Sequence, residues 1–175
     1  MAAGEEVGSV RILDDELILS PSDLTGFAAC AHLTQLDIRA VRGEITKPKR
    51  HDPLIDILVE RGGEHEQQVL ARAEAEMAEA GGACPVAGLP GVVSIDTTTR
   101  TRADLEARAA ETEAAMRDGA AVIYQAVFFR DRWAGYADFL LRVDTPSDLG
   151  PWSYEVADAK LARSVKAAAV LQCCA

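Results

Sequence analysis

Two aspartates and one lysine near the C-terminal end of the chain have types and spacing suited to chemistry. Asp138 lies inside an apolar run, and Asp158 and Lys160 stand two positions apart at the end of a later one. On neighbouring strands, both carboxylates can reach one cation. Carboxylate oxygens suit Mg²⁺ or Mn²⁺, and a nearby lysine can position a water or stabilise charge on a phosphate. The pattern therefore indicates metal-assisted hydrolysis of a phosphate ester.

The same residues also have a purely structural interpretation. Asp138 alternates with Tyr136 and Leu140, and a carboxylate between apolar neighbours is costly unless it is paired or binds a cation. A strand-edge or solvent-facing position would remove that cost. Asp-x-Lys is a common pattern that usually forms a solvated ion pair of little energetic weight. It is the combination of Asp138 with Asp158 and Lys160 that favours a site.

His65 is a third candidate ligand. It lies within a helix predicted from Leu54 to Ala80, in an apolar stripe at helical spacing that predicts a buried face. A histidine in such a stripe is more often a core residue than a ligand. His65-Glu66 does not extend to the zinc-protease motif H-E-x-x-H, because position 69 is valine. The stripe consists of Leu54, Leu58, His65, Val69, Ala73 and Met77.

Capping signals and hydrophobic periodicity predict the elements that position these residues. Ser20-Pro21-Ser22-Asp23 opens a helix expected to end by Gly43, and Thr101-x-x-Asp104 opens another that ends at Gly119. A final helix is expected from about Ala162. The predicted strands are Leu17–Leu19, Val92–Ile95, Ala121–Phe129, Trp133–Val143 and Trp152–Lys160.

The expected fold class is α/β, with a mixed central sheet flanked by helices. We expect the two long strands, Ala121–Phe129 and Trp133–Val143, to form a hairpin. We expect residues 1–19 to be a lead-in segment and residues 20–175 to form one domain. The last helix has no stop signal before Ala175, so we expect the domain to be incomplete at its C-terminus.

Composition narrows the class of protein. The chain has 175 residues, 18 basic and 28 acidic, with a net charge of −10. This excludes a domain held on nucleic acid by positive charge alone, although it leaves open an enzyme that reaches phosphates through metal ions. Neither a signal peptide nor an apolar run of about 18 residues is visible, so we expect a cytoplasmic protein without a membrane segment. Positive charge gathers only at Arg39, Arg42, Lys47, Lys49 and Arg50.

Four short motifs in order resemble those of a nuclease family. Gly135-Tyr136-Ala137-Asp138 and Glu155-Val156-Ala157-Asp158-Ala159-Lys160 are similar to the G-x-x-D and D-x-K motifs of PD-(D/E)XK nucleases. Gly62-Gly63-Glu64-His65-Glu66 resembles the histidine motif of the RecB-like branch, which includes CRISPR-associated exonucleases. Gln172 occupies the position of the glutamine in that branch's Q-x-x-x-Y motif, whose tyrosine would fall at position 176. The resemblance covers Ser20 to Gln172.

The resemblance implies a restriction-endonuclease-like core and a metal-dependent DNA nuclease, associated with a helicase domain in the same or a partner chain. It implies Mg²⁺ or Mn²⁺ held by His65, Asp138 and Asp158, with Lys160 orienting the attacking water. Gln172 would support the site or the DNA. The alternative is a catalytically silent, truncated module that acts at most as a nucleic-acid or protein binding surface.

Cysteines add one further expectation. Cys30 resembles the early cysteine that, in iron–sulfur members of this branch, joins three late ones on a 4Fe-4S cluster. The late cysteines would lie beyond residue 175, so a cluster is expected only in a longer parent chain. A free buried thiol is the other interpretation of Cys30. The chain has no C-x-x-C pair, which argues against a zinc ribbon.

Overall fold

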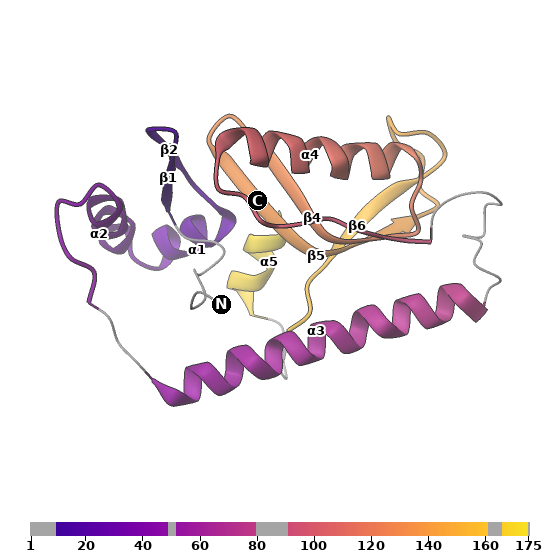
Figure 1. Cartoon of the computed structure of the whole chain (residues 1–175), viewed down its shortest axis with the longest axis horizontal. Coiled ribbons are helices and arrows are strands. Elements are labelled where there is room, and N and C mark those ends of the chain that lie inside the picture. Colours follow the sequence, from indigo (N-terminus) through magenta and orange to yellow (C-terminus); the bar gives the residue numbers. More distant parts are fainter. Residues whose placement is uncertain (1–9, 49–51, 80–90, 161–165, 175) are drawn as a thin grey trace.

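A computed structural model describes residues 10–48, 52–79, 91–160 and 166–174 of the chain. Its centre is a four-stranded sheet in the order β3-β4-β5-β6, in which β3 runs parallel to β4 and the other pairs are antiparallel (Figure 1). The expected α/β class with a mixed sheet is confirmed; the nuclease-type core remains a prediction. The strands are β3 (Val92–Ser94), β4 (Val122–Arg130), β5 (Trp133–Val143) and β6 (Ser153–Ala157).

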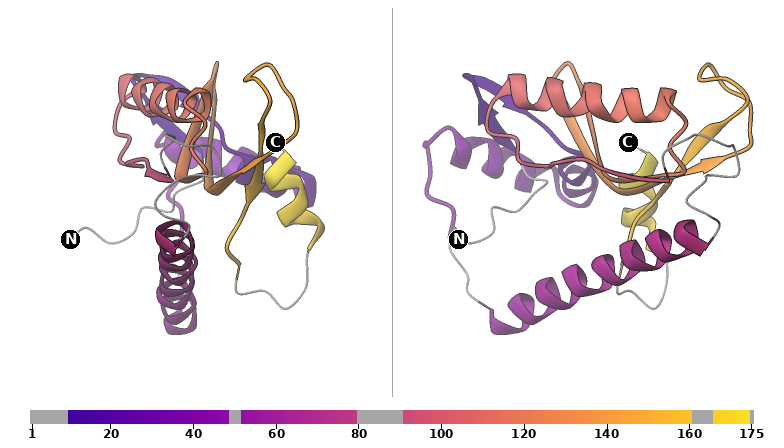
Figure 2. Two further views of the ribbon diagram at one scale, coloured as in Figure 1. Left: turned by 90° about the vertical axis from the view of Figure 1, so that its right-hand side faces the viewer. Right: turned by 45° about the vertical axis from the view of Figure 1, so that its right-hand side comes forward.

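Helices lie on both sides of this sheet. Helix α4 (Arg102–Arg117) connects β3 to β4 and packs along the sheet, whereas α3 (Pro53–Glu79) runs along the opposite side of the molecule (Figures 1 and 2). Helix α5 (Ala167–Cys174) lies near the sheet and contacts α1. The remaining elements come first in the chain: β1 (Arg11–Leu13), β2 (Glu16–Ile18), α1 (Pro21–Ala29) and α2 (Ala31–Val41).

Two capping boxes confirm the predicted helix starts. The hydroxyl of Ser20 accepts from the backbone N–H of Asp23, and the carboxylate of Asp23 accepts from the N–H of Ser20. Thr101 and Asp104 make the same reciprocal pair at the start of α4. These bonds satisfy backbone donors that a helix cannot pair internally, so a local sequence signal suffices to position them.

The predicted helix from Ser20 to Gly43 is wrong in one respect, because it is broken at Cys30. Cys30 has extended backbone angles (φ −159°, ψ 101°), ends α1 and begins α2. Its N–H still donates to the carbonyl of Gly26, at 2.8 Å. The apolar residues keep their helical spacing on both sides of Cys30, so periodicity alone did not reveal the break. The sequence offers only one weak sign of it, since Gly26 is a poor helix former.

The N-terminal segment is joined to the start of β5. Leu19, just after β2, forms a parallel bridge with Trp133. Its N–H donates to the carbonyl of Arg132, and its carbonyl accepts from the N–H of Ala134, both at 2.8 Å. A second bond joins the same segment to α1, because the buried carboxylate of Asp23 also accepts from the N–H of Val10 at 3.0 Å.

The core lies between α4, the sheet and the β1–β2 hairpin. Thr112 is a polar residue within it, 1% exposed. Its hydroxyl accepts from the N–H of Val127 at 3.0 Å and donates to the carbonyl of Arg108 at 3.1 Å. The hydroxyl thus pairs the N–H of Val127, which lies in a part of β4 that the short β3 does not reach. The core cluster includes Leu13, Ile18, Ile95, Leu105, Ile123, Ala126, Val127, Ala134 and Leu140.

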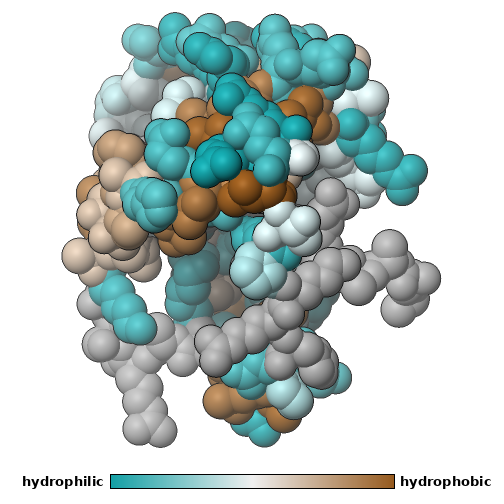
Figure 3. Space-filling model, turned by 90° about the vertical axis from the view of Figure 1, so that its left-hand side faces the viewer, coloured by the Kyte–Doolittle hydropathy of each residue, from teal (hydrophilic) through white to brown (hydrophobic). Residues whose placement is uncertain are grey.

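The predicted α3 helix forms, but the prediction that its apolar stripe is a buried face is wrong at the helix start. Leu54 and Leu58 are 62% and 52% exposed, while His65 and Met77 are half-buried. A helix of 27 residues is about 40 Å long, so its first turns extend past the sheet. Figure 3 shows apolar atoms at this lower end of the molecule. The exposed aliphatic residues there are Leu54, Ile55, Ile57, Leu58 and Val59.

Candidate active site

Strand pairing brings Asp138 and Asp158 together. Leu140 of β5 pairs with Val156 of β6, so continuing this register places position 138 beside position 158. The carboxylate of Asp138 accepts a hydrogen bond from the backbone N–H of Ala159 at 2.8 Å. This contact lies just beyond the end of β6. The predicted strand to Lys160 is therefore too long: after Ala157 the chain turns its N–H to a side chain rather than to a strand.

The contact between the two carboxylates contributes to a raised proton affinity of Asp138. Burial, then the hydrogen bond with Asp158, raises the pKa of Asp138 to about 7. The N–H of Ala159 opposes this by stabilising the charged form, and the charge of Glu66 adds to the rise in the pKa. Two half-buried carboxylates in contact need a shared proton or a cation between them. The arrangement thus favours binding of a positive ion.

Lys160 supplies a positive charge beside this pair. Its Nζ lies 2.9 Å from Oδ1 of Asp158, and its side chain is half-exposed whereas that of Asp158 is largely buried. A half-exposed ammonium can leave one partner for another at little cost, since such ion pairs are weak. Lys160 can therefore hold a water or a phosphate oxygen beside Asp158.

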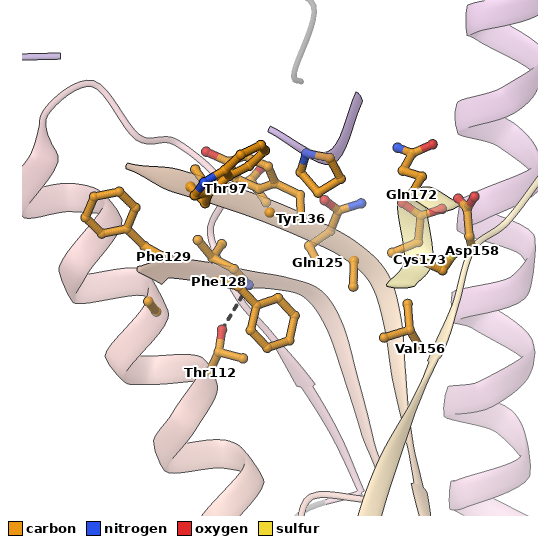
Figure 4. A pocket seen from close by; sticks show the side chains of 18 of the residues that line it. Thr97, Thr112, Gln125, Phe128, Phe129, Tyr136, Val156, Asp158, Gln172 and Cys173 are labelled. Atoms are coloured by element: carbon orange, nitrogen blue, oxygen red, sulfur yellow. Dashed lines mark hydrogen bonds between the residues drawn. The ribbon is translucent and has the colours of Figure 1, made fainter. Parts of the chain in front are cut away.

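The carboxylates stand at one end of a cavity of about 1050 Å³. Figure 4 shows Asp158, Gln172 and Cys173 together at this end, with Phe128, Phe129 and Tyr136 toward the other. Of the residues predicted for the site, Asp138, Asp158, Lys160 and Gln172 all line this cavity.

Helix α5 brings Gln172 to the site. The Gln172 amide donates to the hydroxyl of Ser22 in α1 at 3.3 Å, which orients the side chain at the cavity wall. The neighbouring Cys173 also lines the cavity, and burial together with the Asp158 charge raises the pKa of its thiol. Cys173 is therefore a neutral wall residue at neutral pH.

The α3 residue at the cavity is Glu66, which the sequence analysis did not select. Glu66 lines the cavity and accepts a hydrogen bond from the side chain of Gln125, while the cavity wall does not include His65, which is half-buried beside it. Gln125 lies opposite Asp138 in the β4–β5 register and has left-handed backbone angles (φ 57°) inside a strand. Such a conformation costs about 1–3 kcal/mol and is concentrated at functional sites.

The donor set can be compared with what a divalent cation requires. Within the described ranges, no three His, Cys, Asp or Glu side chains already converge closely enough to hold a metal ion. The Asp138–Asp158 pair nevertheless fits one, because it presents carboxylate oxygens close together and the pKa of Asp138 is raised. Mg²⁺ usually takes only one or two carboxylates and keeps several waters.

The remaining candidates lie away from the cavity. Cys30 is a free, exposed thiol at the α1–α2 junction, so the prediction that it is buried, if free, is wrong. Among the basic residues, Arg39 pairs with Glu44 and Lys47 with Asp37. Lys49 and Arg50 lie outside the described residues.

The chain matches no protein-family model, and comparison with curated proteins and with solved structures gives no significant match. The resemblance to RecB-like nucleases therefore stays a prediction that depends on the motifs and on the site geometry. Among the described helices, none is both long and apolar enough to cross a membrane.

Proposed function

We propose that this chain is a metal-dependent nuclease domain that hydrolyses phosphodiester bonds in DNA. The observation that supports it is the contact between Asp138 and Asp158, with Lys160 ion-paired to the second, at the end of a large cavity. Motif spacing predicts this group of three, and the β5–β6 register, in which Leu140 pairs with Val156, supports the proximity of Asp138 and Asp158.

Each residue has a distinct role in the proposed reaction. Asp138 and Asp158 would hold Mg²⁺ or Mn²⁺, which supplies a Lewis acid for the phosphate and lowers the pKa of a water. Lys160 would orient the attacking water and stabilise charge on the phosphate. In-line attack of that water on phosphorus would form one P–O bond as the opposite P–O bond breaks. The water would lose a proton to solvent, and the leaving oxygen would take one up from solvent. Gln172 would position the substrate at the wall.

The experiment measures cleavage of end-labelled single- and double-stranded DNA in Mg²⁺ and in Mn²⁺. We expect Asp158→Ala and Lys160→Met to lower the rate at least 100-fold, as expected when transition-state stabilisation is lost. Asp148→Ala is the matched control, because Asp148 is an exposed acid outside the cavity and should keep the parental rate. Unchanged cleavage by Asp158→Ala would refute the assignment.

Calorimetric titration with Mn²⁺ separates the enzyme from a silent module. The parent should bind the ion, and Asp138→Ala should not. Binding without cleavage of any DNA would favour the silent binding module. A parent chain that binds no Mn²⁺ would contradict the proposed metal site.

A further inference from the structure

The end of the cavity away from the carboxylates has exposed aromatic rings. Phe128 and Trp133 are 39% and 44% exposed, and both line the cavity. They belong to the two strands of the β4–β5 hairpin, where Phe128 pairs with Gly135 and Trp133 with Arg130. Two large aromatic side chains exposed together on a cavity wall form an apolar patch of the kind that marks ligand-binding grooves.

Two further rings of this wall are held by arginines. The guanidinium of Arg102 lies over the ring of Phe129 at 5.1 Å, and that of Arg11 lies over the ring of Tyr136 at 5.7 Å. The Tyr136 hydroxyl also bonds to Arg11 and to Thr99. These contacts hold the rings of Phe129 and Tyr136, which leaves Phe128 and Trp133 as the exposed rings of this wall.

Two arginines lie close to the exposed rings. Arg130 ends β4 and lines the same cavity, while Arg132 is in the hairpin turn next to Asp131, and all three turn-region charges are exposed. Neither arginine forms an ion pair with any residue in the described part of the chain. In a chain of net charge −10, two free arginines beside two exposed rings are complementary to a ligand with both phosphates and flat bases.

The hairpin is close enough to the carboxylates to contact the same ligand. Gly135, beside Phe128, is three residues from Asp138 on β5, about 10 Å at the rise of a strand. This odd spacing places the two residues on opposite faces of the strand, but the same cavity reaches both. A nucleic-acid strand that lies along this cavity, with its cleaved bond at Asp138 and Asp158, would bring a flanking nucleotide to the hairpin rings.

We propose that Phe128 and Trp133 form a stacking subsite for unpaired nucleobases, with Arg130 and Arg132 contacting the adjacent phosphates. This proposal rests on the proposed nuclease function and specifies its substrate as a strand with unpaired bases. Bases within a duplex are stacked on each other and cannot offer their faces to side chains, whereas a single strand can. The subsite favours no base strongly, because every base has a π-face.

The test measures binding without cleavage, by fluorescence anisotropy of labelled oligothymidylate in EDTA at low salt. The probe is compared with an oligonucleotide of equal length whose central nucleotides lack bases, and with a duplex. We expect the single strand to bind about 5- to 150-fold more tightly than the abasic strand, from the loss of one stacked base. Phe128→Leu and Trp133→Leu should each reduce this ratio toward one.

Phe27→Leu is the matched control, because Phe27 is a 50% exposed aromatic residue in α1 that does not line the cavity. It should leave the ratio unchanged, and thermal melting should show that all three variants are folded. Equal binding of normal and abasic strands by the parent would overturn the subsite, as would duplex binding as tight as single-strand binding. DNA cleavage by the parent with a ratio of one would refute the subsite alone. A large ratio without cleavage would refute the nuclease assignment alone.

Discussion

Replacing Asp138 by asparagine should stabilise the metal-free protein at alkaline pH. Its carboxyl releases a proton near pH 3.8 in the unfolded chain and near pH 7 in the folded one. Between these values the folded chain binds more protons, so the stability of the parent falls as pH rises from about 4 to about 7. Asparagine carries no charge, and its amide can still accept from the Ala159 N–H while donating to Asp158.

The expected gain in the free energy of unfolding follows from the raised pKa of Asp138. A change from 3.8 to about 7 corresponds to about 4 kcal/mol if it is taken in full. Asp138 is only half-buried, so solvent screening reduces the expected gain to about 1–2 kcal/mol. For a chain of this size that is a rise in melting temperature of about 2–8 °C.

Urea denaturation in EDTA at pH 4 and pH 8 measures this. Asp138→Asn should be the more stable protein at pH 8 and should match the parent at pH 4. Saturating Mn²⁺ should restore the order in favour of the parent, because only the parent keeps both ligands. A variant that is less stable than the parent at pH 8 without metal would refute the reasoning.

Three further predictions concern single contacts. Thr112→Val should destabilise the fold by about 1–3 kcal/mol, because it leaves the buried N–H of Val127 unpaired. Thr112→Ser keeps the hydroxyl and should retain most of the stability. Equal urea midpoints for the two variants would contradict this. Asp23→Ala should cost about 2 kcal/mol, since it removes the two bonds that its carboxylate accepts from the N–H groups of Ser20 and Val10. A loss under about 0.5 kcal/mol would show that these bonds are dispensable. Lys160→Met should abolish DNA cleavage yet leave Mn²⁺ affinity within a few-fold, as titration calorimetry can show; a complete loss of Mn²⁺ binding would place Lys160 in a structural role instead.

Much of the fold could be predicted because its signals are local. The caps at Ser20 and Thr101 are side chains that bond the backbone three residues on, so four residues of sequence define each helix start. The long strands β4 and β5 follow from two largely apolar runs and the short connection between them. Because a hairpin makes neighbours in sequence neighbours in space, the meeting of Asp138 with the end of β6 was also within reach.

The remaining features depend on tertiary structure. His65 and Glu66 are adjacent in α3. Periodicity shows which side of a helix is apolar, but it could not show that Glu66 rather than His65 would line the cavity. Nothing in the alternation of β4 indicates the left-handed Gln125 that bonds to it. Leu54 and Leu58 are exposed because α3 extends past the sheet. The periodicity of apolar residues in α3 carries no information about how far the sheet reaches.

The attachment of Leu19 to the start of β5 has a consequence for folding. The segment from β3 to β6 is contiguous, so its contacts close short loops, whereas the bonds from Leu19 to Arg132 and Ala134 close a very long one. Loop-closure entropy therefore makes the N-terminal hairpin dock last and detach first. In native-state hydrogen exchange, the Ala134 amide should open at a lower free energy than the centre of β4. Molecules in that partly open state would expose Trp133 further, so the aromatic end of the cavity would fluctuate while its carboxylate end stays closed.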